Sequence, residues 1–161
     1  MKYSFESISE QINSLKANGK RIVFTNGVFD ILHAGHVDYL NKARELGDIL
    51  IVGLNSDSSV KRIKGEKRPL VNEIERAFII SNLKAVNFVC IFNEDTPFNL
   101  ISAIIPDILV KGGDWTIENI VGKDVVEGNG GKVLNIPFVN FQSTTSIVKT
   151  VLERYCIDKR E

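Results

Sequence analysis

The stretch RIVFTNGVFDILHAGHVDYLNKARE, residues 21–45, decides the fold. It opens with residues 22–24, a short run of β-branched and aromatic side chains that is typical of a buried strand. Asn26 and Gly27 then break the run with turn chemistry. From Val37 onward, apolar residues recur at three-residue steps, which predicts a helix. The stretch therefore predicts a strand, a short connection and a helix, as in a parallel α/β sheet.

His33 and His36, the only histidines in the sequence, stand at the start of this predicted helix. Open α/β sheets bind ligands outside the carboxyl ends of their strands. A helix N-terminus also presents free N–H groups and a positive dipole end to phosphate. We therefore expect both imidazoles to reach one phosphate group. Hydrogen-bonded structural histidines and a zinc site are the alternatives, but the sequence offers no third zinc ligand nearby.

Strand-like and helical patterns alternate along the rest of the chain, which favours a Rossmann-like, doubly wound α/β fold with helices on both faces. We interpret residues 1–161 as one nucleotide-binding domain, with a helical extension over residues 1–19. Ser7 and Glu10 have capping-box spacing at the start of that extension. A parallel sheet of five strands is predicted over residues 22–24, 49–54, 88–92, 108–110 and 132–136.

Another helix is predicted between the second and third strands. Asn72 and Glu75 resemble a helix cap, and the pattern extends to Leu83. Ile74, Phe78 and Leu83 are expected to face the core from this helix.

A polar, basic segment precedes that helix, and we interpret it as a loop. Most of its cations are expected to be solvated. One or two, however, are placed to lie over a bound triphosphate from the carboxyl edge of the sheet. Lys64 is the first candidate because Gly65 lets the backbone close over a ligand, and Lys61 is the second. The basic residues are Lys61, Arg62, Lys64, Lys67 and Arg68.

Two further segments offer groups that bind anions. Lys111 and Gly112 follow the fourth strand, where paired glycines indicate a tight turn with close backbone approach. Ser143, Thr144 and Thr145 open the last predicted helix. One hydroxyl suffices to cap a helix. Three in a row therefore predict a second phosphate-binding helix end.

Composition indicates an ordinary globular protein. The 161 residues have a mass of 18.0 kDa, 43% are hydrophobic and 25% are charged, and the net charge is zero. Zero net charge gives no indication of a nucleic-acid or membrane-surface partner. No apolar run is long enough to cross a bilayer. Cys90 and Cys156 resemble incidental thiols more than a disulfide framework, so we expect a cytoplasmic location.

Residues 27–36, GVFDILHAGH, resemble the G-x-F-D-x-x-H-x-G-H signature of the cytidylyltransferase-like nucleotidyltransferases. Within that family the chain is closest to the nucleotidyltransferase half of bifunctional heptose-phosphate kinase/adenylyltransferases. Matching stretches cover nearly all of the chain after Lys20. They are TNGVFDILHAGH, LNSD, KG-x-x-RP, ER, EDTP, LVKGGDW, NGG and STT.

This resemblance implies a reaction between ATP and heptose 1-phosphate that gives ADP-heptose and pyrophosphate. It also implies Mg²⁺ bound with ATP rather than in a dedicated protein site, and a homodimer. A cytidylyl- or guanylyltransferase acting on another sugar or polyol phosphate is one alternative. A nucleotide-binding module without catalysis is another, although both histidines and the Ser-Thr-Thr motif are present.

The resemblance also implies roles for individual residues. The catalytic candidates are His33, His36 and Lys64. Nucleotide binding is expected, besides the two histidines, from Asn26, Gly27, Val28, Phe29, Gly35, Lys111, Gly112, Asp114, Ser143, Thr144 and Thr145. Sugar-phosphate binding is expected from Asp30, Asn55, Lys61, Arg68 and Arg76. For Asp30 the turn itself is the alternative partner, and for Arg76 it is a surface ion pair.

One departure from the family concerns the base. Cytidylyltransferases for glycerol phosphate carry an arginine a few residues before the Ser-Thr-Thr motif, whereas residues 137–140 contain none. Phe138, Val139 and Phe141 offer an apolar wall suited to a purine. The sequence therefore favours adenine.

Overall fold

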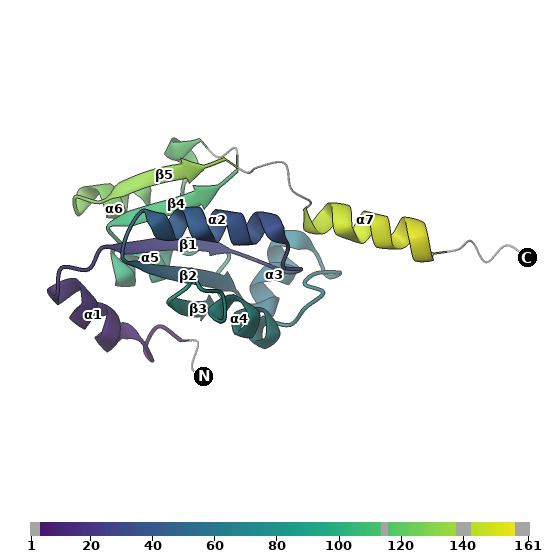
Figure 1. Ribbon diagram of the computed structural model, residues 1–161, viewed down its shortest axis with the longest axis horizontal. Helices are drawn as coiled ribbons and strands as arrows, with labels where there is room; N and C mark the ends of the chain where they lie inside the picture. The colour runs from purple at the N-terminus through teal and green to yellow at the C-terminus, as the bar shows by residue number, and fades with distance from the viewer. Residues whose placement is uncertain (1–3, 114–115, 138–142, 157–161) are drawn as a thin grey trace, which may run out of the picture.

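The computed structural model describes residues 4–113, 116–137 and 143–156. Its centre is one sheet of five parallel strands in the order β3-β2-β1-β4-β5 (Figure 1). The predicted sheet is confirmed. The strands are β1 (Ile22–Gly27), β2 (Ile49–Asn55), β3 (Phe88–Phe92), β4 (Ile108–Gly112) and β5 (Lys132–Ile136).

Helices cover both faces of the sheet, because neighbouring residues of each strand point to opposite sides. In β1, Val23 belongs to the core under α2 and α4, whereas Ile22 and Phe24 belong to the core under α1, α5 and α6. The doubly wound arrangement is thus confirmed. The helices are α1 (Ser9–Ala17), α2 (Ala34–Glu45), α3 (Asp57–Lys64), α4 (Glu73–Ser81), α5 (Phe98–Ile104), α6 (Lys123–Gly128) and α7 (Thr144–Tyr155), with a 3₁₀ turn at Ile117–Asn119.

The strand order reverses at β1, which has β2 on one side and β4 on the other. Connections from the ends of β1 and β4 therefore diverge and leave a crevice, where sheets of this kind bind ligands. Asn26 lies near the end of β1 and Lys111 near the end of β4. The topology thus places the histidine segment and the Lys111–Gly112 segment at one edge.

Two local predictions are wrong. Helix α1 begins at Ser9 with no side-chain cap, because the Ser7 hydroxyl donates to the Ser4 carbonyl oxygen at 2.7 Å instead. The basic segment is also not all loop. Ser56 caps α3 by accepting from the Ser59 N–H, so Lys61 and Lys64 lie on a helix.

The orientation predicted for α4 is also wrong. Asn72 caps the helix as expected, accepting from the Glu75 N–H at 3.0 Å. Of the three residues expected to face the core, Leu83 packs against it just after the helix, but Ile74 and Phe78 are 57% and 58% exposed. The helix turns Arg76 inward, together with Ala77 and Ile80. The polar partners of that arginine decide the orientation, and the apolar pattern EIERAFIIS fits either one.

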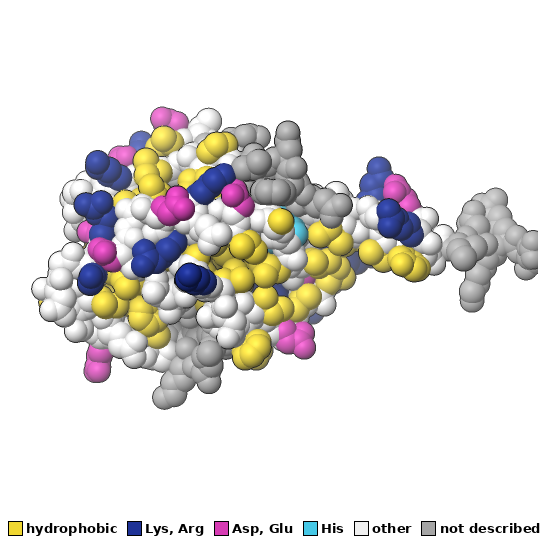
Figure 2. Space-filling model, viewed as in Figure 1, with side chains coloured by type: hydrophobic (Ala, Val, Ile, Leu, Met, Phe, Trp, Pro, Cys, Tyr) yellow, Lys and Arg dark blue, Asp and Glu magenta, His cyan; other side chains and the backbone are white. Residues whose placement is uncertain are grey.

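Helix α7 extends from the domain at the end opposite α1 (Figure 1). None of its described residues is buried. Figure 2 shows apolar side chains along one side of α7 and over the adjoining part of the domain. In the described part of the chain, no helix is long and apolar enough to span a membrane.

Candidate active site

The connection between β1 and α2 is tightly built. Phe29 has a φ of +47°, which is uncommon for a residue with a side chain. Its ring lies so close to Gly27 that a Cβ atom there would be 2.9 Å from the ring edge. Glycine at position 27 thus lets the aromatic ring fold back over the end of β1.

This folded connection places the two imidazoles against each other. The rings of His33 and His36 are stacked, with centroids 3.8 Å apart and planes 23° from parallel. Phe29 packs edge-on against His36, with ring centroids 5.1 Å apart. His33 is the N-cap residue of α2, so both rings lie at the helix N-terminus, where Gly35 is buried in the first turn. The prediction that the histidines share one side of that turn is confirmed.

Burial favours the neutral form of both histidines. Burial first, and then repulsion by a charge on the neighbouring His33, lower the pKa of His36 to about 4, and burial lowers the pKa of His33. Among the described residues, neither buried Nδ1 atom has a hydrogen-bond partner. Each neutral ring retains one N–H donor. A histidine side chain also reaches the surface where α7 leaves the domain (Figure 2), so the pair is open to a ligand.

The lowered pKa of His36 predicts that acid destabilises the fold. Between pH 6.5 and about 4, the unfolded chain binds a proton more readily than the folded one, so stability falls as the pH falls through that window. Allowing for partial exposure, we expect a loss of about 1–3 kcal/mol. Urea unfolding at several pH values measures it. His36→Gln lacks the titrating group and should lose less; equal losses in both proteins would contradict the assignment.

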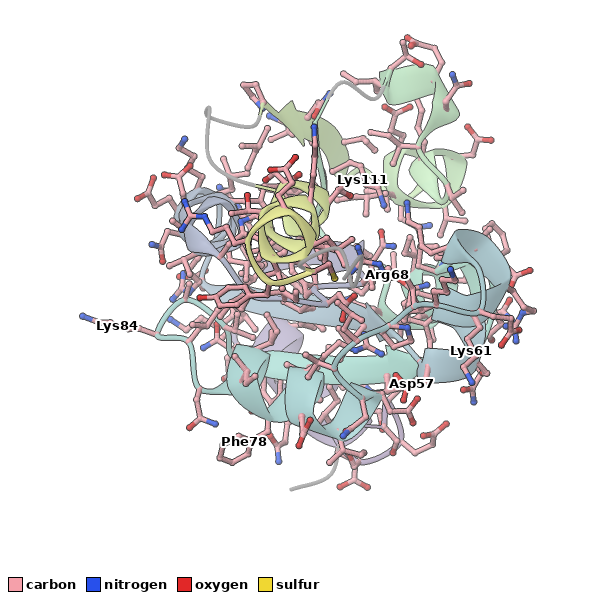
Figure 3. The ribbon with its side chains drawn as sticks, turned by 90° about the vertical axis from the view of Figure 1, so that its right-hand side faces the viewer. Asp57, Lys61, Arg68, Phe78, Lys84 and Lys111 are labelled. Atoms are coloured by element: carbon pink, nitrogen blue, oxygen red, sulfur yellow. The ribbon has the colours of Figure 1, made fainter. Side chains whose placement is uncertain are left out.

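A lysine from the neighbouring strand faces the same crevice. The Lys111 ammonium donates to Asn26 Oδ1 at 3.0 Å, which joins β4 to the end of β1. Burial lowers the pKa of Lys111, and the charge of Lys64 lowers it further. The structure thus brings Asn26 and Lys111 into contact, with Lys64 near enough for its charge to act on Lys111. Lys61 and Lys64 are both exposed on α3, and Figure 3 labels Lys61 on that helix. The charge that acts on Lys111 is that of Lys64, so Lys64 fits a shared anion better.

Asp30 holds the segment before α4 in place. Its buried carboxylate accepts from the Arg68 guanidinium at 2.7 Å and from the backbone N–H groups of Leu70 and Val71. Asp30 thus binds a distant segment of the chain, neither a sugar nor the turn in which it lies, and its side chain is almost fully buried. Arg68 stays partly exposed, and its role as a phosphate ligand stays a prediction.

Arg76 and Asn55 are not placed to touch a substrate. Arg76 is fully buried, and its guanidinium donates to three carbonyl oxygens and to Asp57 Oδ1. Asn55 is also buried and donates to Ser59 Oγ at 3.0 Å. The substrate-binding role predicted for both is corrected to a structural one. Sequence reasoning missed Asp57, although its position just after β2 was a usable signal.

The Ser-Thr-Thr motif lies beside the segment that carries the histidines. Ser143 forms a reciprocal capping box with Ser146, so its hydroxyl serves the helix itself. Thr144 Oγ1 lies 3.4 Å from the Ile31 carbonyl oxygen, which places the start of α7 beside the loop that carries His33. The Thr145 side chain is exposed at the same helix end. Asp114, Phe138, Val139 and Phe141 lie outside the described residues.

The chain matches one family of known proteins over most of its length. Residues 24–150 match the model of the cytidylyltransferase-like family. The chain is 59% identical over 150 residues to the bifunctional protein HldE of Trichlorobacter lovleyi, and 60% identical over 144 residues to that of Pelobacter propionicus. These matches cover 93% and 89% of the chain, but the chain spans only about 30% of the length of either relative.

A solved structure shows the same fold. It is a lipopolysaccharide core biosynthesis protein from Thermoplasma volcanium, which matches with a TM-score of 0.63 and 31% identity over 77% of this chain and 100% of the other. The fold and the family match together define a nucleotidyltransferase. The chain belongs to the cytidylyltransferase-like family, and its similarity to the HldE proteins covers nearly its whole length.

Proposed function

We propose that this protein condenses ATP with D-glycero-D-manno-heptose 1-phosphate to give ADP-heptose and pyrophosphate, a cytoplasmic step toward bacterial lipopolysaccharide and other surface glycans. The observation that carries the proposal is the stacked His33–His36 pair at the N-terminus of α2, at the same edge of the sheet as Lys111, which contacts Asn26 at the end of β1. The heptose pathway is supported by the similarity to the HldE proteins. Residues 1–161 act as one domain in this proposal.

The chemistry needs positioning and charge stabilisation more than a nucleophile from the protein. A phosphate oxygen of the sugar phosphate attacks the α-phosphorus of ATP in line. The new O–P bond forms as the bond between the α-phosphorus and the bridging oxygen breaks, and pyrophosphate leaves with that electron pair. His36 donates a hydrogen bond to an α-phosphate oxygen as charge builds there. Lys111 and Lys64 neutralise the rest of the triphosphate.

Mg²⁺ is proposed to enter with the triphosphate, which supplies most of its ligands together with water. The site fits that arrangement, because the groups gathered at the crevice are N–H donors and ammonium groups that bind anions. Among the described residues, the buried carboxylate nearby is that of Asp30, and it already accepts three hydrogen bonds. The ion, when bound, offsets part of the phosphate charge.

The base is expected to be adenine, because residues 137–140 contain no arginine to read a cytosine edge. A pocket built for one base rejects others, since unmatched buried polar groups are costly. With heptose 1-phosphate as acceptor, we expect kcat/KM for ATP to exceed that for CTP at least about tenfold. Pyrophosphate release measured across four nucleoside triphosphates and a panel of sugar 1-phosphates tests base and acceptor together. A preference for CTP would instead identify a cytidylyltransferase.

A homodimer is part of the proposal. Helix α7 exposes Val151, Leu152 and Tyr155, which are 50%, 53% and 78% accessible. A helix of 12 residues is marginal in water without packing along its apolar side. A second copy that covers this side would supply the packing. Light scattering of the purified protein measures the mass directly.

A further inference from the structure

We propose that Arg76 is a positioning residue, which holds the peptide group that leads into Phe29, a residue with positive φ, and thereby fixes the Phe29 ring against His36. The expected effect on turnover rests on the proposed function, whereas the structural role of Arg76 is independent of it. Arg76 touches neither histidine, so it acts through the backbone and the aromatic ring between them.

The Arg76 guanidinium joins four segments of the site. Nη1 donates to the carbonyl oxygens of Val28 at 2.7 Å and Asn55 at 2.9 Å, Nε donates to that of Val71 at 2.9 Å, and Nη2 donates to Asp57 Oδ1 at 2.7 Å. These partners belong to the β1–α2 connection, the end of β2, the segment before α4 and the start of α3. The side chain is fully buried, so no water competes for these bonds.

The hydrogen bond to the Val28 carbonyl oxygen matters most, because the next residue, Phe29, has the strained backbone conformation. The Val28 carbonyl belongs to the peptide group that leads into Phe29, and Phe29 has the positive φ of +47°. Residues with side chains keep such a conformation only where their surroundings hold it, and such positions cluster at functional sites. The short hydrogen bond from the buried Arg76 guanidinium to the Val28 carbonyl oxygen supplies this constraint.

The backbone conformation of Phe29 in turn sets the orientation of its ring toward His36. Phe29 is buried and stands edge-on to His36, with ring centroids 5.1 Å apart. Gly27 leaves room for this ring, since a Cβ atom there would collide with it. His36 is stacked on its other neighbour, His33. A chain of contacts therefore runs from Arg76 through Val28 and Phe29 to His36.

The test variant is Arg76→Lys, which removes the planar guanidinium group and keeps the positive charge. A lysine at position 76 offers one ammonium group and cannot reach four partners in one plane. We expect folded Arg76→Lys to lose about tenfold or more in kcat, because small misplacements of a catalytic group are costly. KM for either substrate should change by less than about threefold, since no substrate contact is lost.

The imidazole resonances give a readout that does not depend on turnover. The chain has only two histidines, so the ring signals of His36 are assigned by comparison with His36→Gln. We expect Arg76→Lys to shift them in the absence of substrate. Arg44→Lys is the matched control, because Arg44 also donates to a carbonyl oxygen, that of Gly47, but at the far end of α2. It should leave the signals and kcat unchanged.

Two results would overturn the proposal: a folded Arg76→Lys protein with unchanged imidazole signals, or one whose only defect is a higher KM. The latter would indicate a direct substrate contact. If Arg76→Lys does not fold, Asp57→Asn decides, because this carboxylate is one-third exposed and orients the same guanidinium. It should shift the His36 signals in wild-type-like folded protein, and unshifted signals would refute the proposal. The signals are read without substrate, so they stay informative if ATP and heptose 1-phosphate are the wrong substrates.

Discussion

Replacing His36 with alanine is expected to lower kcat by about 10²–10³ while the fold persists. Its imidazole donates to a phosphate oxygen whose charge grows in the transition state, and one such donor contributes roughly 2.7–4 kcal/mol. Because the interaction forms mainly in the transition state, kcat and kcat/KM should fall together. Steady-state pyrophosphate release measures both.

The variant His36→Gln shows whether the reaction needs the hydrogen-bond donor alone or the imidazole ring as well. His36→Gln keeps an amide N–H on a side chain of similar length, so it should retain more activity than His36→Ala. Circular dichroism and thermal unfolding check that both variants fold. A folded His36→Ala protein with near-normal kcat would remove His36 from the reaction. The stacked partner His33 would then be the next imidazole to test.

The parts of the fold that sequence predicts are those that depend on local pattern. Buried parallel strands are nearly continuous apolar runs. For this reason each of the apolar runs predicted as strands does form one, at residues 22–24, 49–54, 88–92 and 108–110. The histidine pair was likewise predictable, since three-residue spacing at a helix start fixes a shared side.

The parts that sequence missed depend on partners far along the chain. Arg76 finds acceptors 5, 19, 21 and 48 residues away, and no local pattern indicates that it points inward. Asp30 binds a segment 38 to 41 residues later. Their burial turns α4 and leaves Phe78 exposed. Two residues expected to meet the sugar phosphate thus hold the site together instead.

The lysine on β4 is expected to show the other large effect. Lys111→Met should lower kcat/KM for the nucleotide by about 10², because losing one partner of a desolvated charge pair costs roughly 2–5 kcal/mol. Its position supports this, since the ammonium group is held by Asn26 Oδ1 at the switch point of the sheet and shares the crevice with Lys64. Lys84→Met is the matched control, because Lys84 is exposed on a distant turn (Figure 3).

The pH dependence of the same lysine gives an independent check. Burial and the Lys64 charge lower the pKa of Lys111, so the ammonium group loses its proton at a lower pH than a solvated lysine does. Nucleotide affinity should therefore fall as the pH rises through that pKa. Lys111→Arg stays charged over the whole range and should bind nucleotide with little alkaline decline. Titration calorimetry with ATP at rising pH measures the affinities, and parallel curves for the two proteins would show that Lys111 does not carry the phosphate contact.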